Sequence, residues 1–429
     1  MHWPGANQVK YGGMNQKTIA LRNTFTVFFF VFFIVSMLGG LFWANLLFVQ
    51  RASISLDFLP LWKGAHNLLV DGLTPYGEFT TYEIQKLVYG RVAGPGELPL
   101  RVSMPLPLLL LFLPFGAFAD MELARAAWMV LLEVGVILLV VFSLRLAQWR
   151  VRWFELLFVV FFGVFWAASV NSLLSANIAV LLAAFLLGAM LALRASFDEL
   201  AGMLLALSFF NLETGGLLLL FLLVWVTLNG RWRVWAGLLM TLTLLTVMAF
   251  IIDAHWALLF LRAAFINWNA NNDPSTITLF TGWFPGLGEI IAWGLAFILL
   301  LLLMVETQQA FRRSELQWVW LAALVAAITP LVGLPIKQSG LVFLLPAFIL
   351  TASILTQRWA VIGGWAGLIT LVFAFSCFWL FSAYGVESGF VWMSLFAILM
   401  LYGVRWWVAR PTRLWADRVT EERMNRASF

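Results

Sequence analysis

Apolar runs of membrane-crossing length recur throughout the chain, and they limit its fold more than any other feature. A helix needs about 17–25 predominantly apolar residues to cross a bilayer. Hydrophobic residues make up 63% of the 429 residues and charged residues only 11%, whereas a soluble domain carries about 25% charged residues. The sequence therefore predicts an all-α polytopic membrane protein.

Twelve segments are the best candidates for these crossings. They are 24–49, 124–145, 154–171, 177–194, 200–212, 214–229, 235–252, 286–305, 318–334, 340–357, 360–381 and 389–404. The first is too long for a signal-peptide core and lacks a small-residue cleavage pattern, so we interpret it as a retained span. This division leaves an N-terminal tail (1–23), a membrane domain (24–404) and a basic C-terminal tail (405–429).

Basic residues near the ends of these segments predict the orientation, because Lys and Arg are enriched in cytoplasmic loops. Most of the 26 Lys and Arg residues fall on one side if the N-terminus is inside. We therefore expect a multi-pass protein of the cell membrane with both termini cytoplasmic. Two long loops, 50–123 and 253–285, are then expected outside, and the unusual polar residues gather on that side.

Two apolar regions do not fit a simple span. The segment 103–118, "SMPLPLLLLFLPFGAF", contains three prolines and would reach only about 24 Å as a helix. We interpret it as re-entrant or as lying along the outer interface, with a short span as the alternative. Spans 200–212 and 214–229 meet at "FFNLETGG" (209–216), and such a break at membrane depth must face protein or a watery cavity.

Asp57 lies near the start of the most unusual polar stretch, "SLDFLPLWKGAHNLLVDGLTPYG" (55–77). One interpretation makes Ser55 or Asp57 the N-cap of the following helix, since both residue types are favoured caps. The other makes Asp57 a general base, because a partly desolvated carboxylate gains basicity and can take a proton from a hydroxyl. The two roles are compatible.

The residues after Asp57 predict a helix on the outer membrane surface. Their apolar stripe has helical spacing and consists of Phe58, Leu61, Trp62, Ala65, Leu68 and Leu69. Lys63 and His66 fall outside this stripe. A solvated face explains them most simply, and a role in a substrate site is the alternative.

Further polar residues mark other outer junctions. Glu213 lies in the membrane zone, where an ionisable residue is a functional hypothesis by default, although a paired structural carboxylate is equally consistent. Lys337, followed by Gln338, could snorkel at a span end or meet an anionic phosphate. Asp273 and Asn177 are most simply a turn residue and a hydrogen-bonded span end.

Several kinds of chemistry are not indicated by the sequence. It contains no phosphate-binding loop, no dinucleotide fingerprint, and neither the metalloprotease nor the serine-hydrolase motif. A single cysteine, Cys377, excludes an intramolecular disulfide and cysteine-based metal patterns. We therefore predict no nucleic-acid partner and no cofactor. A divalent metal is not indicated, and Asp57 could share one with Glu213 or Asp273 only if the fold brings them together.

Five stretches resemble the family 87 glycosyltransferases. "LDFLPLWKGAHNLLVDGLTPY" (56–76) is similar to the block that follows the first span of that family. The others follow in the family's order: "MPLPLLLLFLPFGAF" (104–118), "ANIAVLLAAFLLGAMLALR" (176–194), "ELAGMLLALSFFNLETGGLLLLFLLVWVTLNGRWR" (199–233) and "ITPLVGLPIKQSGLVFLLPAFIL" (328–350). The chain departs from the family at Ser175-Ala176 and at Asn211-Leu212-Glu213.

The resemblance implies a GT-C-type fold and the transfer of a hexose, with mannose as the sugar of the family, from a polyprenyl-phosphate sugar. The acceptor would be a hydroxyl of a glycolipid or glycan outside the cytoplasm, and the transfer would invert the anomeric carbon. Asp57 would then be the general base. Lys337, Arg101 or Lys63 would meet the donor phosphate, and Glu213, Asn177, His66, Gln338 and Asp273 complete the candidate site. Two alternatives stay open, a flippase or transporter of a lipid-linked saccharide and an inactive structural relative.

Overall fold

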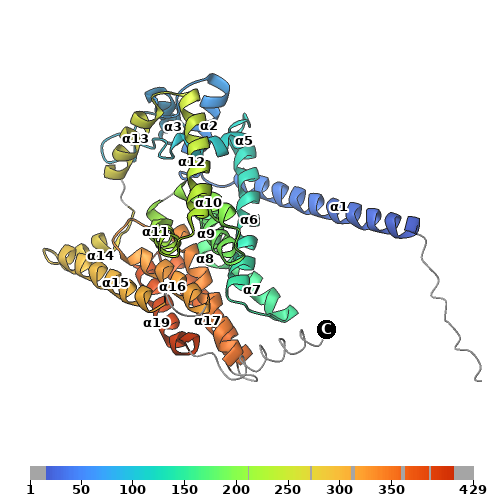
Figure 1. The fold of residues 1–429 in the computed structure, drawn as a ribbon. Helices are drawn as coiled ribbons and strands as arrows, with labels where there is room; N and C mark the ends of the chain where they lie inside the picture. Colours follow the sequence, from blue (N-terminus) through green and yellow to red (C-terminus); the bar gives the residue numbers. More distant parts are fainter. Residues whose placement is uncertain are drawn as a thin grey trace, which may run out of the picture.

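The computed structural model describes residues 16–210, 212–270, 273–310, 315–358, 363–385 and 388–409. Within these ranges all regular structure is helical, as the apolar runs predict, and Figure 1 shows the helices stacked into one bundle with an outlying first helix. Most of the two predicted tails, 1–23 and 405–429, lies outside the described residues.

The N-terminal half contains a first long helix, an outer cap of short helices and the first bundle helices. They are α1 (Gln16–Val49), α2 (Leu59–His66), η1 (Asn67–Asp71), α3 (Glu78–Tyr89), α4 (Leu106–Leu109), η2 (Leu110–Phe112), α5 (Leu113–Gly116), α6 (Met121–Leu146), α7 (Trp153–Phe165), α8 (Ala167–Leu174), α9 (Ala179–Arg194), α10 (Asp198–Leu207) and η3 (Ser208–Phe210).

The C-terminal half continues the bundle and includes the second long loop (253–285). Its elements are α11 (Leu212–Leu228), α12 (Trp232–Ile252), α13 (Trp256–Ala270), α14 (Thr276–Trp283), α15 (Gly288–Ala310), α16 (Glu315–Ile328), η4 (Thr329–Leu331), η5 (Gln338–Leu344), α17 (Leu345–Arg358), α18 (Gly363–Ala383) and α19 (Gly389–Ala409).

Among the described residues, seven helical segments are long and apolar enough to cross a membrane. They are Phe25–Val49, Met121–Leu146, Trp232–Ile252, Gly288–Gln308, Gln338–Arg358, Gly363–Ala383 and Gly389–Val408. The bent pair α7–α8 would make an eighth. Polytopic character is thus supported, whereas the count of twelve stays a prediction. The predicted span 200–212 corresponds to α10, which has only 10 residues and reaches about 15 Å.

The predicted single span 154–171 is broken in the structure. Helices α7 and α8 meet at an angle of 48°, because Trp166 leaves the helical conformation with ψ of 135°. Its side chain is fully buried against Phe348 and Phe378. The carbonyl of Phe165 accepts a hydrogen bond of 3.0 Å from the indole of Trp379. Tertiary packing therefore forms this break, and no Gly or Pro in the sequence marks it.

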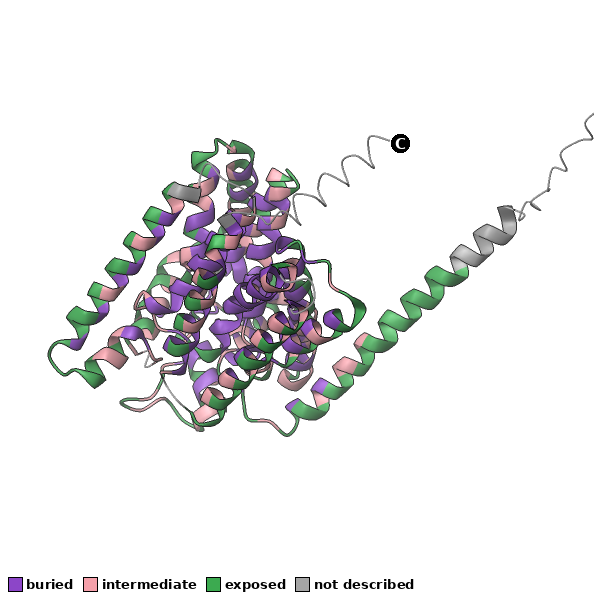
Figure 2. Ribbon diagram, turned by 90° about the horizontal axis from the view of Figure 1, so that it is seen from below, coloured by how far each residue is buried: buried purple, intermediate pink, exposed green. Residues whose placement is uncertain are grey.

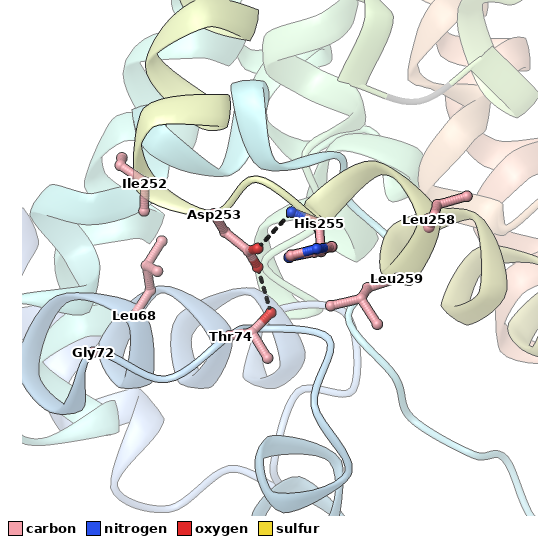
Figure 3. Close-up of a pocket in the computed structure, with 8 residues that line it drawn as sticks. All are labelled: Leu68, Gly72, Thr74, Ile252, Asp253, His255, Leu258 and Leu259. Atoms are coloured by element: carbon pink, nitrogen blue, oxygen red, sulfur yellow. Dashed lines mark hydrogen bonds between the residues drawn. The ribbon is translucent and has the colours of Figure 1, made fainter.

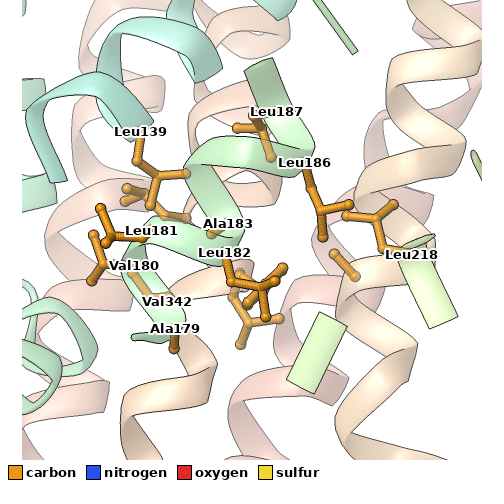
Figure 4. Packing of buried hydrophobic residues seen from close by; sticks show 14 of the residues in the cluster. Leu139, Ala179, Val180, Leu181, Leu182, Ala183, Leu186, Leu187, Leu218 and Val342 are labelled. Atoms are coloured by element: carbon orange, nitrogen blue, oxygen red, sulfur yellow. The ribbon is translucent and has the colours of Figure 1, made fainter. Parts of the chain in front are cut away.

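Helix α9 lies at the centre of the bundle. Almost all of its residues are buried, and Figure 4 shows its leucines and alanines packed against Leu139 of α6, Leu218 of α11 and Val342 of η5. Helices in lipid associate through such close packing and not through exclusion of water. In Figure 2 the buried residues fill the bundle, whereas α1 projects from it and exposes its Phe-rich face.

The segment 103–118 belongs to an outer cap on the bundle. It divides into α4, η2 and α5, so it is not among the helices long enough to cross. The indole of Trp62 in α2 donates to the Phe118 carbonyl at 3.2 Å, and His66 Nδ1 lies 2.8 Å from the Gly116 carbonyl. The predicted surface helix over 58–70 is α2 with η1, and it packs on this segment.

Loops that the charge pattern assigns to the same side contact one another. Arg194 donates to the carbonyl of Arg145 at 3.3 Å, and Arg231 donates to that of Leu193 at 2.7 Å. Among the loops predicted on the other side, Thr74 in the first long loop donates a hydrogen bond of 2.9 Å to Asp253 in the second long loop. These contacts agree with the predicted grouping of the loops, and the side of the membrane on which each group lies stays a prediction.

Helices α10 and α12 approach closely at Gly202, and this contact yields a stability prediction. A Cβ atom on Gly202 would lie 2.1 Å from the Val234 carbonyl oxygen. We expect Gly202→Ala to lower the free energy of unfolding by about 1–3 kcal/mol through overpacking. The thermal midpoint of the purified protein in detergent measures this.

The matched control is Gly294→Ala in α15, where a Cβ would meet nothing within 4 Å. It should leave the midpoint unchanged or slightly higher, because alanine favours helix over glycine. Equal midpoints for Gly202→Ala and the unaltered protein would contradict the close contact.

Candidate functional site

Asp57 is bound by side chains from distant parts of the chain. Its Oδ2 accepts a hydrogen bond of 2.8 Å from the amide of Asn177, and its Oδ1 lies 2.5 Å from the ammonium of Lys337. Its side chain is only 15% exposed. Both carboxylate oxygens therefore have partners, and three segments that are remote in sequence meet at this residue.

The expectation that Asp57 caps the following helix is wrong. The hydroxyl of Ser55, the other predicted candidate, accepts a hydrogen bond of 3.1 Å from the backbone N–H of Phe58. Helix α2 begins only at Leu59, and Asp57 makes no capping contact with it. Ser55 binds the N–H at this end, and the Asp57 carboxylate binds Asn177 and Lys337 instead.

A rigid turn places Asn177 opposite Asp57. Three consecutive carbonyls of this turn accept hydrogen bonds from side chains: Leu174 from Arg125, Ser175 from Ser55 and Ala176 from Trp128. Ala176 has a positive φ of 52°, a conformation that costs free energy for a residue with a Cβ. The three side chains hold the turn in that conformation, and Asn177 follows directly.

Arg125 joins the turn to the loop that carries Asp57. Arg125 is 3% exposed, and its guanidinium donates to the carbonyl of Ser53 at 2.7 Å and to that of Leu174 at 2.6 Å. Arg forms such planar, two-armed contacts better than Lys. Arg125 is not among the predicted site residues, although an arginine among the apolar residues of "MELARAAW" (121–128) is a signal for a buried contact.

Lys337 lies among three carboxylates. Its ammonium is 4.0 Å from Asp273 as well as paired with Asp57, and the charge of Glu213 also acts on it. Desolvation alone would lower the pKa of Lys337, but Asp57, Asp273 and Glu213 outweigh it and raise that pKa above its usual value. The lysine therefore stays charged at neutral pH.

Hydrogen bonds between helix ends fix the backbone next to Lys337. Gln338 accepts from the amide of Asn171 at 3.0 Å, and the Ser339 carbonyl accepts from Ser172 at 2.9 Å. Asn171 and Ser172 belong to α8, so the start of η5 is tied to the same turn that orients Asn177. The Lys337 side chain itself is 46% exposed, and it is the least constrained part of this site.

A cavity of about 260 Å³ opens beside Lys337. Asp273, Lys337, Gln338 and Ser382 form its polar side, and its apolar side consists of Pro274, Ile336, Leu341, Phe378, Phe381, Gly385, Gly389 and Phe390. Small-molecule sites typically combine an apolar wall with a few polar groups in this way. The cavity thus adjoins the cluster around Asp57.

Three predicted site residues are engaged elsewhere. Lys63 pairs with Glu83 at 3.3 Å, which ties α2 to α3. His66 contacts the Gly116 carbonyl and stacks on Trp62. Arg101 pairs with Glu78 at 2.8 Å. Their contacts hold the outer cap together, so a role for them at the cluster around Asp57 receives no support from the geometry.

A larger cavity of about 510 Å³ lies between the two long loops and contains none of the predicted site residues (Figure 3). Its polar side is formed by Thr74, Asp253 and His255, and leucines and Ile252 line the rest. Asp253 accepts from the Thr74 hydroxyl and from the backbone N–H of His255, at 2.9 Å each. These contacts tie the two loops together.

Tyr76 supports the same part of the cap. Its phenol donates to the Met104 carbonyl at 2.6 Å, and burial, with a smaller effect of the Asp253 charge, raises the pKa of Tyr76. The phenol therefore stays protonated and remains a donor.

Within the described residues, no group of three or more His, Cys, Asp or Glu side chains is arranged to hold a metal ion. Asp57 and Asp273 do approach each other, as the metal alternative requires, but the ammonium of Lys337 lies between them. Searches against family models, curated proteins and solved structures gave no match for the chain.

The arginine that joins the two segments yields a second stability prediction. Replacing Arg125 with Met keeps the apolar stem of the side chain but removes the guanidinium and leaves two carbonyls without these donors, and an unsatisfied buried polar group costs about 1–3 kcal/mol. We expect Arg125→Met to lower the thermal midpoint clearly.

Arg51→Met is the control, because Arg51 is an exposed arginine of the loop that Arg125 binds at Ser53. It should unfold at the midpoint of the unaltered protein. If Arg125→Met were as stable as Arg51→Met, the proposed clamp on the turn would be wrong.

Proposed function

We propose that the chain is a membrane glycosyltransferase that moves a hexose from a polyprenyl-phosphate sugar to an acceptor hydroxyl on the extracytoplasmic face. The observation that carries this proposal is the meeting of Asp57, Asn177 and Lys337 beside an apolar cavity. A carboxylate and an ammonium side by side provide a proton acceptor and a partner for a phosphate. Mannose is the sugar that the resemblance to family 87 favours.

Asp57 would act as the general base. A positioned base contributes about 10²- to 10⁴-fold to the rate when it lies within hydrogen-bond reach of the proton. Asp57 fits this role because Asn177 fixes its orientation and because little of the side chain is exposed to water. Small motions of the carboxylate would otherwise reduce the fraction of productive encounters.

Lys337 would bind the phosphate of the donor. Its ammonium is a compact charge on a flexible stem, and it lines the cavity together with Gln338 and Ser382. The aromatic rings Phe378, Phe381 and Phe390 offer an apolar surface to the first prenyl units. Arg101 and Lys63, which pair with Glu78 and Glu83, are second choices for the phosphate.

The reaction then balances without a further reactant. The acceptor oxygen forms a bond to the anomeric carbon as the bond from that carbon to the phosphate oxygen breaks. The acceptor proton passes to Asp57, and the polyprenyl phosphate leaves with the bonding electrons, opposite the charge of Lys337. Attack from the face opposite the leaving group inverts the anomeric carbon. The acceptor would be a hydroxyl of a glycolipid or a glycan.

The position of the cluster favours an enzyme over a flippase or transporter. Transporters place their substrate sites near the midplane, commonly at broken helices. Asp57, Asn177, Asp273 and Lys337 instead all lie in connections between helices, and these connections belong to the loops predicted outside. An inactive relative would share this geometry, so activity decides that alternative.

Substitution of the base tests the proposal. We expect Asp57→Asn, which keeps the shape of the side chain, to reduce transfer of labelled mannose from polyprenyl-phosphate mannose to a membrane acceptor fraction by about 100-fold or more. The variant should still purify as a folded protein, because the amide can keep one hydrogen bond to Asn177.

Asp71→Asn is the matched control, since Asp71 is an exposed carboxylate of the same outer loop. It should transfer at the rate of the unaltered protein. Transfer by Asp57→Asn at that rate would exclude Asp57 as the base, and no transfer by any form would favour the transporter or the inactive relative.

A further inference from the structure

Both oxygens of the Asp57 carboxylate are occupied, and a reaction that uses this carboxylate as a base needs one of them free. Oδ1 is paired with the Lys337 ammonium, and Oδ2 accepts from the Asn177 amide. A base must offer an oxygen to the hydroxyl whose proton it takes. One of the two partners therefore has to leave before the acceptor can bind productively.

Asn177 is the partner that stays. The oxygen of its side-chain amide accepts a hydrogen bond of 2.9 Å from the backbone N–H of Ala179 at the start of α9. The turn before it is held by Arg125, Ser55 and Trp128. The amide is thus bound through both its nitrogen and its oxygen, on a backbone that the turn holds, and turning it away would break both of these hydrogen bonds.

Lys337 is the partner that can leave. Its side chain is 46% exposed, three times the exposed fraction of Asp57 at 15%. It is a long, flexible side chain on a fixed backbone, and Asp273 at 4.0 Å offers a second carboxylate. Lys337 also lines the cavity of about 260 Å³, so the ammonium stands between Asp57 and the space into which a ligand would enter.

We propose that the Asp57–Lys337 ion pair is a latch that the phosphate of the donor opens. The entering phosphate binds the ammonium, Lys337 turns toward the cavity, and Oδ1 of Asp57 becomes free for the acceptor hydroxyl. This inference rests on the proposed function and adds an order to it, with the donor binding before the acceptor. Without a donor the base stays covered.

The charges around Lys337 make the exchange reversible. Asp57, Asp273 and Glu213 all act on the same ammonium, so the three carboxylates oppose an incoming anion and hold the lysine near the site. A phosphate must therefore compete with Asp57 for Lys337. By linkage, removing the competing carboxylate strengthens anion binding by the free energy that the ion pair contributed.

The test measures binding of farnesyl phosphate, which has a prenyl chain and a phosphate but no sugar, to the full chain in detergent. We expect Asp57→Asn to bind it about 3- to 10-fold more tightly than the unaltered protein, as the loss of a partly exposed ion pair implies. Lys337→Met should bind at least about 10-fold more weakly. The double variant should match Lys337→Met, because without the lysine there is no latch to open.

Two controls separate the latch from other effects. Farnesol, which lacks the phosphate, should bind all four forms alike, and Asp71→Asn should bind farnesyl phosphate like the unaltered protein. Asp57→Ala must show the same tightening as Asp57→Asn. This second variant covers the case in which one substitution disturbs the fold.

The possible results distinguish the latch from the proposed function. Equal or weaker binding of farnesyl phosphate by both Asp57 variants, with binding still lost in Lys337→Met, would overturn the latch but keep Lys337 as the phosphate partner. Tightening of farnesol binding to the same extent would overturn it too. If no form binds farnesyl phosphate, both the latch and the donor assignment fail.

Discussion

The hydrogen bond between Asn177 and Asp57 is the contact on which the candidate site depends. It joins segments 120 residues apart, and neither segment could hold its position alone. The loop before α2 has no regular structure, and the turn before α9 contains an alanine in the left-handed region. Arg125 binds both segments from α6, so the carboxylate is fixed by buried hydrogen bonds to side chains as well as by the helices.

The helices form a scaffold, and the connections between them carry the candidate site. The buried core around α9 consists almost entirely of leucine, alanine and other apolar side chains. The polar cluster lies at helix ends, where water can solvate the outer side of the charges. An ammonium can lie among three carboxylates there, because a partly exposed charge cluster avoids the large desolvation cost of a fully buried charge cluster.

The sequence alone predicts the all-helical class and several of the residues that meet in the candidate site. Asp57, Lys337, Glu213 and Asp273 are conspicuous because charges are rare in such a chain, and the fold brings them together. Lys63, His66 and Arg101 are equally conspicuous, yet they bind the outer cap. Local spacing cannot separate these groups, since the partner of each residue lies far along the chain. For the same reason the break at Trp166 and the role of Arg125 follow only from tertiary packing.

An experimental structure of the chain with a bound polyprenyl-phosphate sugar tests the central claim most directly. The account predicts the phosphate against the ammonium of Lys337, the prenyl chain along Phe378 and Phe381, and the anomeric carbon facing Asp57, with Asn177 still bound to the carboxylate. A donor bound elsewhere, for example in the larger cavity beside Asp253, with the pair of Asp57 and Lys337 intact, would contradict it.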